Sequence, residues 1–268
     1  IYIVISSMKK PIAIVSIPFD EKSSFLQGPA QAPQKIWDTL NDGSSNMLTE
    51  LGVALIDGET YQHAGEIKVN DYLEDISNGI SSVLQTHDKV ITLGGDHSIA
   101  FPVINAYHNK YPDLHILQFD AHTDLYDEFE GDKHSHACPF ARIMENDLAQ
   151  SLTQVGIRVV STKHQSQIDR FNVQVITAKD WFEGKRPSIK GPLYISLDLD
   201  VLDPGYAPGL SHHEPGGLSP RDVVTMIQSI DVPIIGADIV EYNPTRDHAD
   251  MTAAVAAKFL KEIMGKMA

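Results

Sequence analysis

The sequence predicts an α/β fold, a three-layer α/β/α sandwich with a mainly parallel sheet. Short apolar runs rich in β-branched residues recur along the 268 residues, and stretches with helical signals lie between them. Several runs are apolar almost throughout, which is typical of strands covered on both faces of a sheet. A hydrophobic content of 42% with 21% charged residues is sufficient for a large core.

Eight apolar runs are candidate strands. They are residues 12–17, 53–57, 90–93, 114–119, 153–159, 173–177, 193–199 and 234–241. Four stretches favour helices: residues 29–40, 70–85, a segment opened by Ser219 and Pro220, and residues 251–264. The helical signals are proline near the start of a stretch, apolar residues three and four positions apart, and a serine N-cap.

The length of the chain and its cysteine content limit the number of domains and the cellular compartment. We expect residues 8–268 to form a single domain, because α/β domains of this size commonly fold as one unit. Residues 1–7 are expected to be a non-native or artefactual leader, since they lack the basic flank and cleavage site of a signal peptide. The single cysteine, Cys138, excludes an internal disulfide and fits a reducing, cytoplasmic compartment. No apolar run in the sequence reaches membrane-spanning length.

The net charge restricts the partners. A formal net charge of −15 argues against nucleic acid or an anionic membrane as a partner, and it mildly favours a cationic substrate. Solubility is an equally simple explanation of the charge, and bound metal ions would cancel part of it.

Three strong metal ligands alternate directly after the apolar run 114–119: Asp120, His122 and Asp124. In extended backbone, side chains two residues apart project to the same side, so these three side chains can converge. An imidazole between two carboxylates in this pattern has no routine structural use. The segment therefore predicts half of a metal site.

Further ligands follow other candidate strands, at the carboxyl ends where parallel sheets bind ligands. The complete candidate set is His97, Asp120, His122, Asp124, Asp198 and Asp200. Four carboxylates and two imidazoles suffice for two divalent ions, and an oxygen-rich set without thiolate favours two Mn²⁺ over Zn²⁺. Such ions would acidify a water molecule into a nucleophile. Glu241, at the end of the last strand, is then free to hold a guanidinium group.

Residues 94–97, 120–124 and 196–200 resemble, in the same order, the three metal motifs of the ureohydrolases, the superfamily of arginase and agmatinase. Residues 23–30, 126–131, 135–137, 211–219 and 240–244 are similar to the plant-type arginase branch. The resemblance implies an eight-stranded parallel sheet and a homo-oligomer, either a trimer or a hexamer.

The resemblance also implies residue roles. Asp120 and Asp198 would bridge two Mn²⁺ ions. His97 and Asp124 would complete one ion, and His122 and Asp200 the other. His136 would be a proton shuttle and Glu241 would grip the substrate guanidinium, so that the expected catalytic residues are His136, Glu241 and Asp124.

The expected reaction is hydrolysis of a small guanidino substrate, L-arginine to ornithine and urea. Alternatives are agmatine to putrescine and urea, another guanidino or formimino acid, or a degenerate metal-binding protein without activity. Residues 125–131 depart from the Asn- and Ser-containing loop of common animal and bacterial arginases, and we expect this loop to distinguish arginine from agmatine. The sequence leaves three roles possible for His212 and His213: packing within the loop, contact with the substrate, or an extra metal site. Asp96 and Asp238 are open between turn or strand-end roles and support of the metal ligands.

Overall fold

The computed structural model describes residues 10–268; the expected leader, residues 1–7, lies outside the described residues. Eight strands form one sheet in the order β2-β1-β3-β8-β7-β4-β5-β6, and every neighbouring pair is parallel. The strands are β1 (Ile12–Ile17), β2 (Tyr61–Glu66), β3 (Val90–Gly94), β4 (His115–Phe119), β5 (Ser151–Ile157), β6 (Gln174–Thr177), β7 (Leu193–Asp198) and β8 (Ile234–Val240). The predicted α/β sandwich with an eight-stranded sheet is confirmed, and the sheet is parallel throughout.

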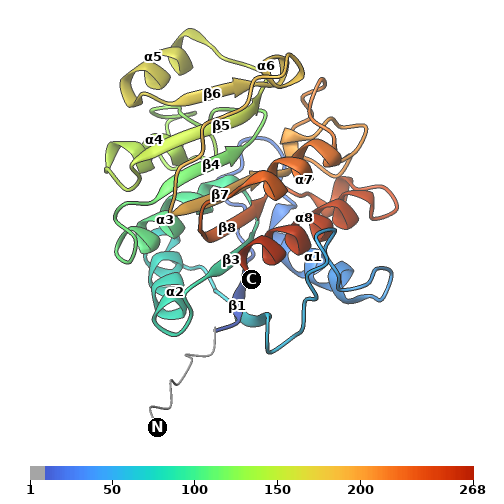
Figure 1. Ribbon diagram of the computed structural model, residues 1–268. Helices are drawn as coiled ribbons and strands as arrows, with labels where there is room; N and C mark the ends of the chain where they lie inside the picture. Colours follow the sequence, from blue (N-terminus) through green and yellow to red (C-terminus); the bar gives the residue numbers. More distant parts are fainter. Residues whose placement is uncertain (1–9) are drawn as a thin grey trace.

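Helices cover both faces of this sheet (Figure 1). They are α1 (Ala32–Asn41), α2 (Tyr72–Thr86), α3 (Ala100–His108), α4 (Pro139–Glu145), α5 (Thr162–Phe171), α6 (Ala178–Phe182), α7 (Pro220–Ser229) and α8 (Met251–Met267). Short 3-10 helices are η1 (Pro29–Gln31), η2 (His97–Ile99), η3 (Leu199–Val201) and η4 (Pro244–Arg246). Within residues 10–268, no helix combines the length and the apolar character needed to cross a membrane.

Two hydrophobic cores lie on opposite faces of the sheet, because side chains alternate along each strand. In β1, Ile14 packs with apolar residues of α1, α7 and α8, whereas the next residue, Val15, packs with those of α2 and α3. This double burial explains why the central strands are apolar almost throughout.

One expected strand is wrong. Residues 53–57 do not join the sheet, because their backbone bonds back onto residues 47–49 through a tight turn at Gly52, whose φ is 81°. Leu55 is nevertheless buried, which accounts for the apolar signal. The second strand in chain order is instead β2, at the edge of the sheet, where a mostly exposed and polar sequence provides no apolar run.

The other seven expected strands are present, with ends shifted by at most two residues. All four expected helices are present, and the structure adds α3 to α6. Two of these short helices begin at capping boxes, Ser161 with His164 and Thr177 with Asp180, which are signals that the sequence contains.

The centre of the sheet positions the candidate site. The strands β3, β8, β7 and β4 are consecutive neighbours, so the segments that follow their carboxyl ends meet at one edge. All expected metal ligands and Glu241 lie at or just after the ends of these four strands.

Candidate metal centre and active site

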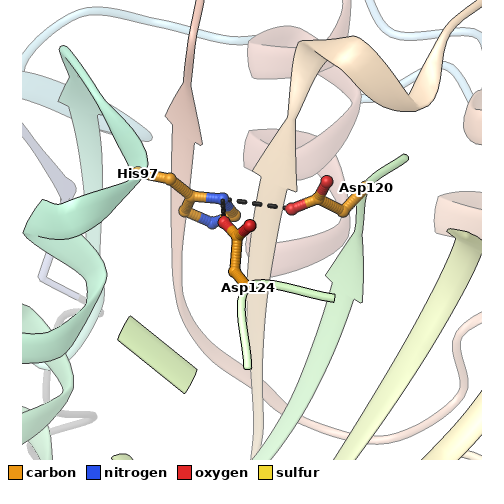
Figure 2. A group of neighbouring side chains, drawn as sticks. All are labelled: His97, Asp120 and Asp124. Carbon is orange, nitrogen blue, oxygen red and sulfur yellow. Dashed lines mark ion pairs between the residues drawn. The ribbon is translucent and has the colours of Figure 1, made fainter. Parts of the chain in front are cut away.

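The first cluster of ligands surrounds the imidazole of His97. Its Nδ1 lies 3.1 Å from Asp120 Oδ2, 3.0 Å from Asp124 Oδ2 and 3.3 Å from Asp198 Oδ2. Figure 2 shows His97 between the carboxylates of Asp120 and Asp124. The His97 side chain is fully buried. One imidazole and three carboxylates thus converge on a single point at the end of the sheet.

A second cluster adjoins the first through Asp120. His122 Nδ1 lies 2.8 Å from Asp200 Oδ2 and 3.7 Å from Asp120 Oδ1. Asp120 therefore presents Oδ2 to the first cluster and Oδ1 to the second. In the first group, the donor atoms of His97, Asp120 and Asp124 lie close enough to share one ion. In the second group, those of Asp120, His122 and Asp200 do the same. A carboxylate between two such clusters has the arrangement of a bridging ligand.

The tautomer of His97 tests whether these residues fit a metal. Ser196 Oγ donates a hydrogen bond to Asp238 Oδ1 at 2.7 Å, so its oxygen is left to accept the Nε2–H of His97 at 2.9 Å. Nδ1 of the neutral ring then carries a lone pair, and this buried atom has no hydrogen-bond partner among the described residues. A lone pair facing three carboxylates is repulsive unless a proton or a metal cation lies between them. The geometry therefore fits a divalent cation.

The pKa values of the ligands also indicate a site that requires positive charge. Burial, together with the charges of Asp124 and Asp200, raises the pKa of Asp120 to about 8. Burial opposes protonation of His122, but the charge of Asp200 outweighs it and raises the pKa of His122 to about 11. Without a metal, protons would thus neutralise part of the cluster, and divalent ions can take their place.

Next to the candidate metal ligands, Glu241 and His136 form a buried pair. His136 Nδ1 lies 2.9 Å from Glu241 Oε1, and the same oxygen accepts the backbone N–H of His97 at 2.8 Å. Ser24 contacts the other side of the imidazole, with its Oγ 2.8 Å and its backbone N 3.2 Å from His136 Nε2. Glu241 has a φ of 65°, so the chain turns sharply there at the end of β8.

Asp96 holds the segment that carries Ser24. Its Oδ2 accepts the backbone N–H of Lys22 at 2.9 Å, and its Oδ1 accepts the backbone N–H of Ser98 at 3.0 Å. Burial and the nearby charge of Glu241 raise the pKa of Asp96 to about 6. Asp96 and Asp238, which the sequence left open, both support the site indirectly. Sequence reasoning did not identify Ser24, although it lies in one of the segments that carry the resemblance.

A pocket of about 250 Å³ opens over the clusters. Its lining residues are Ser24, His122, Asp124, Tyr126, Phe129, His136, Ala137, Val159, His164, His212 and Glu214. The loop of residues 125–131 contributes two aromatic rings to this wall. Its acidic residues do not line the pocket, and Asp127 instead pairs with Arg142.

The two histidines that the sequence left open differ in position. The ring of His212 lies against His136, His122 and Phe25, with centroid distances of 5.4, 6.2 and 5.4 Å. His213 is exposed and its Nε2 lies 2.9 Å from the backbone oxygen of Pro208. Neither belongs to a potential metal-binding group among residues 10–268. His212 is thus part of the pocket wall, and His213 packs within its own loop.

The chain is similar in sequence and in structure to known proteins. Arginase 2 (chloroplastic/mitochondrial) of Arabidopsis thaliana is 40% identical over 284 residues, which cover 98% of this chain and 82% of that protein. Agmatinase of Bacillus anthracis is 30% identical over 268 residues, covering 94% of this chain and 90% of that protein. Arginase from Medicago truncatula superimposes with a TM-score of 0.90 at 38% identity, covering 97% of this chain and 88% of that chain.

The family assignment rests on nearly the whole chain. The model of the arginase family matches residues 10–265, a span that includes every ligand of both clusters, Glu241 and His136. The chain therefore belongs to the arginase family and is a ureohydrolase.

Proposed function

We propose that this ureohydrolase converts L-arginine to ornithine and urea with two Mn²⁺ ions. One observation carries the proposal: Asp120 lies between two candidate ligand clusters, and Glu241, paired with His136, accepts the backbone N–H of His97 in the first cluster. The similarity to plant arginases, at 40% and 41% identity over almost the full chain, supports arginine as the substrate.

The two clusters would hold the ions. His97 and Asp124 would bind one ion, His122 and Asp200 the other, and Asp120 and Asp198 both. The oxygen-rich ligand set without thiolate suits Mn²⁺. Bound ions of this kind act as Lewis acids and lower the pKa of water, which supplies a nucleophile near neutral pH.

The protein side chains would orient the substrate and move a proton. The Glu241 carboxylate would accept hydrogen bonds from the substrate guanidinium and direct its carbon toward the ligand clusters. Burial disfavours the charged form of His136, but the charge of Glu241 raises its pKa to about 9, so the ring is protonated at neutral pH. His136 can therefore donate a proton to the nitrogen of the departing amine.

Agmatine is the second candidate substrate, and the pocket supplies the observation that favours it. Among the described residues, no lysine or arginine lines the pocket, so no side chain with a permanent positive charge faces a substrate carboxylate there. Agmatine lacks the carboxylate of arginine and would place no anion in this wall.

A urea assay with purified Mn²⁺-loaded protein tests the proposal. Arginine and agmatine are compared at matched concentrations, and a sample stripped of metal with a chelator is the control. A higher kcat/KM for arginine supports the first assignment, and a higher value for agmatine supports the second. Metal binding without hydrolysis of any guanidino or formimino compound would instead favour a degenerate metal-binding protein.

A further inference from the structure

Glu214 is a carboxylate in the pocket wall that has no side-chain partner among the residues that the structure describes. It is half-buried in the loop between η3 and α7, and within residues 10–268 it has no ion pair or side-chain hydrogen bond. The pocket's other ionisable residues nearest the clusters are engaged: Asp124 with His97, His122 with Asp200, and His136 with Glu241. Glu214 is thus an available negative charge facing the pocket.

The loop around Glu214 is held in a fixed shape. Asp203 Oδ2 accepts the backbone N–H of Gly216 at 2.8 Å, and Ser211 Oγ donates to the backbone oxygen of Leu26 at 3.1 Å. Gly216 has a φ of 91°, a conformation that favours glycine, so the turn directly after Glu214 and Pro215 depends on this residue. A carboxylate on an anchored loop is suited to recognition, because little conformational entropy is lost when it binds.

The rest of the wall suits an aliphatic chain with a positive far end. Tyr126, Phe129 and Val159 provide apolar surface, and no lysine or arginine of the described chain lines the pocket to compete for Glu214. Glu214 is more exposed than Asp124 and His136, which places it nearer the solvent side of the same pocket. A substrate that enters with its guanidinium toward Glu241 would therefore bring its other end toward Glu214.

We propose that Glu214 binds the ammonium group at the substrate end opposite the guanidinium. This inference rests on the proposed function. Arginine and agmatine both carry such an ammonium group, whereas 4-guanidinobutyrate has a carboxylate at that end. A charge-assisted hydrogen bond to Glu214 would select the two amines and repel the guanidino acid. The carboxylate that selects the substrate is then Glu214, in the segment 211–219, and not an acidic residue of the loop 125–131.

The test compares Glu214→Gln with the wild-type protein on arginine, agmatine and 4-guanidinobutyrate. Glutamine keeps the size and removes the charge, so kcat/KM for the two amine-bearing substrates should fall roughly 10- to 100-fold, mainly through KM. The value for 4-guanidinobutyrate should be unchanged or higher. Glu128→Gln is the matched control, because Glu128 is exposed and lies outside this pocket.

Calorimetric binding of ornithine to the Mn²⁺-loaded proteins provides a measurement that does not require turnover. Wild-type protein and the Glu128→Gln variant should bind ornithine equally, and Glu214→Gln roughly 10-fold more weakly. The inference is overturned if Glu214→Gln lowers kcat/KM equally for all three substrates, or if the variant and the wild type bind ornithine with equal affinity. Either result leaves the proposed function intact. Wild-type protein that hydrolyses none of the three substrates overturns the proposed function instead, and the ornithine measurement still decides the role of Glu214.

Discussion

His136 and Glu241 are 105 residues apart in the sequence, yet His136 Nδ1 lies 2.9 Å from Glu241 Oε1 in the buried site. Burial raises the cost of charge on both groups, but their pairing lowers the pKa of Glu241 and raises that of His136 to about 9. The same carboxylate is proposed to bind the guanidinium of the substrate. Under this proposal the imidazolium and the guanidinium would be two cations that share one carboxylate, and Glu241 would be the central residue for substrate binding.

Replacing Glu241 with alanine should separate substrate binding from metal binding. Glu241 is not a member of either ligand cluster, so the Glu241→Ala variant should keep both ions. Loss of the charge-assisted pair with the guanidinium should reduce kcat/KM at least about 100-fold. Metal analysis and a urea assay on the same sample check both statements. Full activity in this variant would contradict the assigned role.

The fold was predictable where burial on both faces of the sheet leaves an apolar run, as in β1 and β8. It was not predictable at β2, because an edge strand is stabilised by backbone pairing and needs no apolar face. Residues 53–57 show the opposite case: Leu55 is apolar because it fills the core, while its backbone N–H bonds to Met47 outside the sheet. A local apolar pattern indicates that a segment is buried more directly than it indicates that the segment pairs with other strands.

Most of the candidate site was predictable because its residues follow strands that end at one edge of the sheet. Ser24 and Glu214 were not identified, because their roles depend on how the loops that carry them return to the pocket. A serine or a glutamate in a loop has no distinctive local signal. The loop 125–131 is expected to distinguish arginine from agmatine, and its contribution to the pocket wall is aromatic, through Tyr126 and Phe129.

Asp124→Asn should remove one ion selectively. Asp124 has a φ of 49°, a left-handed conformation that asparagine also adopts, so the substitution should not disturb the backbone. The variant loses a charged ligand beside His97 but leaves Asp120, His122 and Asp200 intact. We expect metal content to fall toward about one ion per chain and urea release to be nearly abolished. Two tightly bound ions with full activity would refute this assignment.

Ser196→Ala should weaken metal binding without removing a ligand. Ser196 Oγ accepts the Nε2–H of His97 and so keeps Nδ1 free for an ion. Loss of such a partner typically reduces metal affinity about 10- to 100-fold. Competition with a metal-binding dye measures the affinity. Ser188→Ala is the matched control, since Ser188 is exposed, and comparable affinities in the two variants would argue against the role of Ser196.

Glu50 should stabilise the fold only above acidic pH. Hydrogen bonds with Arg221 and Lys258 lower its pKa from 4.5 to about 2. A lowered folded-state pKa means that the contribution is complete above pH 4.5 and is lost as the pH falls toward 2. Because the side chain is 34% exposed, Glu50→Gln should cost only about 1 kcal/mol of unfolding free energy at pH 7. Urea unfolding at pH 7 and pH 3 measures the difference, with exposed Glu59→Gln as the control. A deficit in Glu50→Gln that persists undiminished at pH 3 would contradict the pairing.

Metal binding should release protons, and metal affinity should rise with pH. In the metal-free protein, burial opposes charge on His97 and His122, but the surrounding carboxylates raise both pKa values, that of His122 to about 11. His122 is therefore an imidazolium at pH 7.5 and the carboxylates favour the same form of His97, whereas a histidine that binds a metal must be a neutral imidazole. Addition of Mn²⁺ should release about two protons per chain, and more if Asp120, with a pKa of about 8, is also protonated.

Calorimetric titration of the metal-free protein with Mn²⁺ in buffers of different ionisation enthalpy counts the released protons. The His122→Gln variant is the matched comparison: glutamine carries no titrating proton, so the count should fall by about one. Affinity measured between pH 6.5 and 8.5 should increase with pH, because protons and Mn²⁺ compete for the same atoms. Binding of Mn²⁺ with no proton release and no pH dependence would mean that the ions occupy groups other than these two clusters.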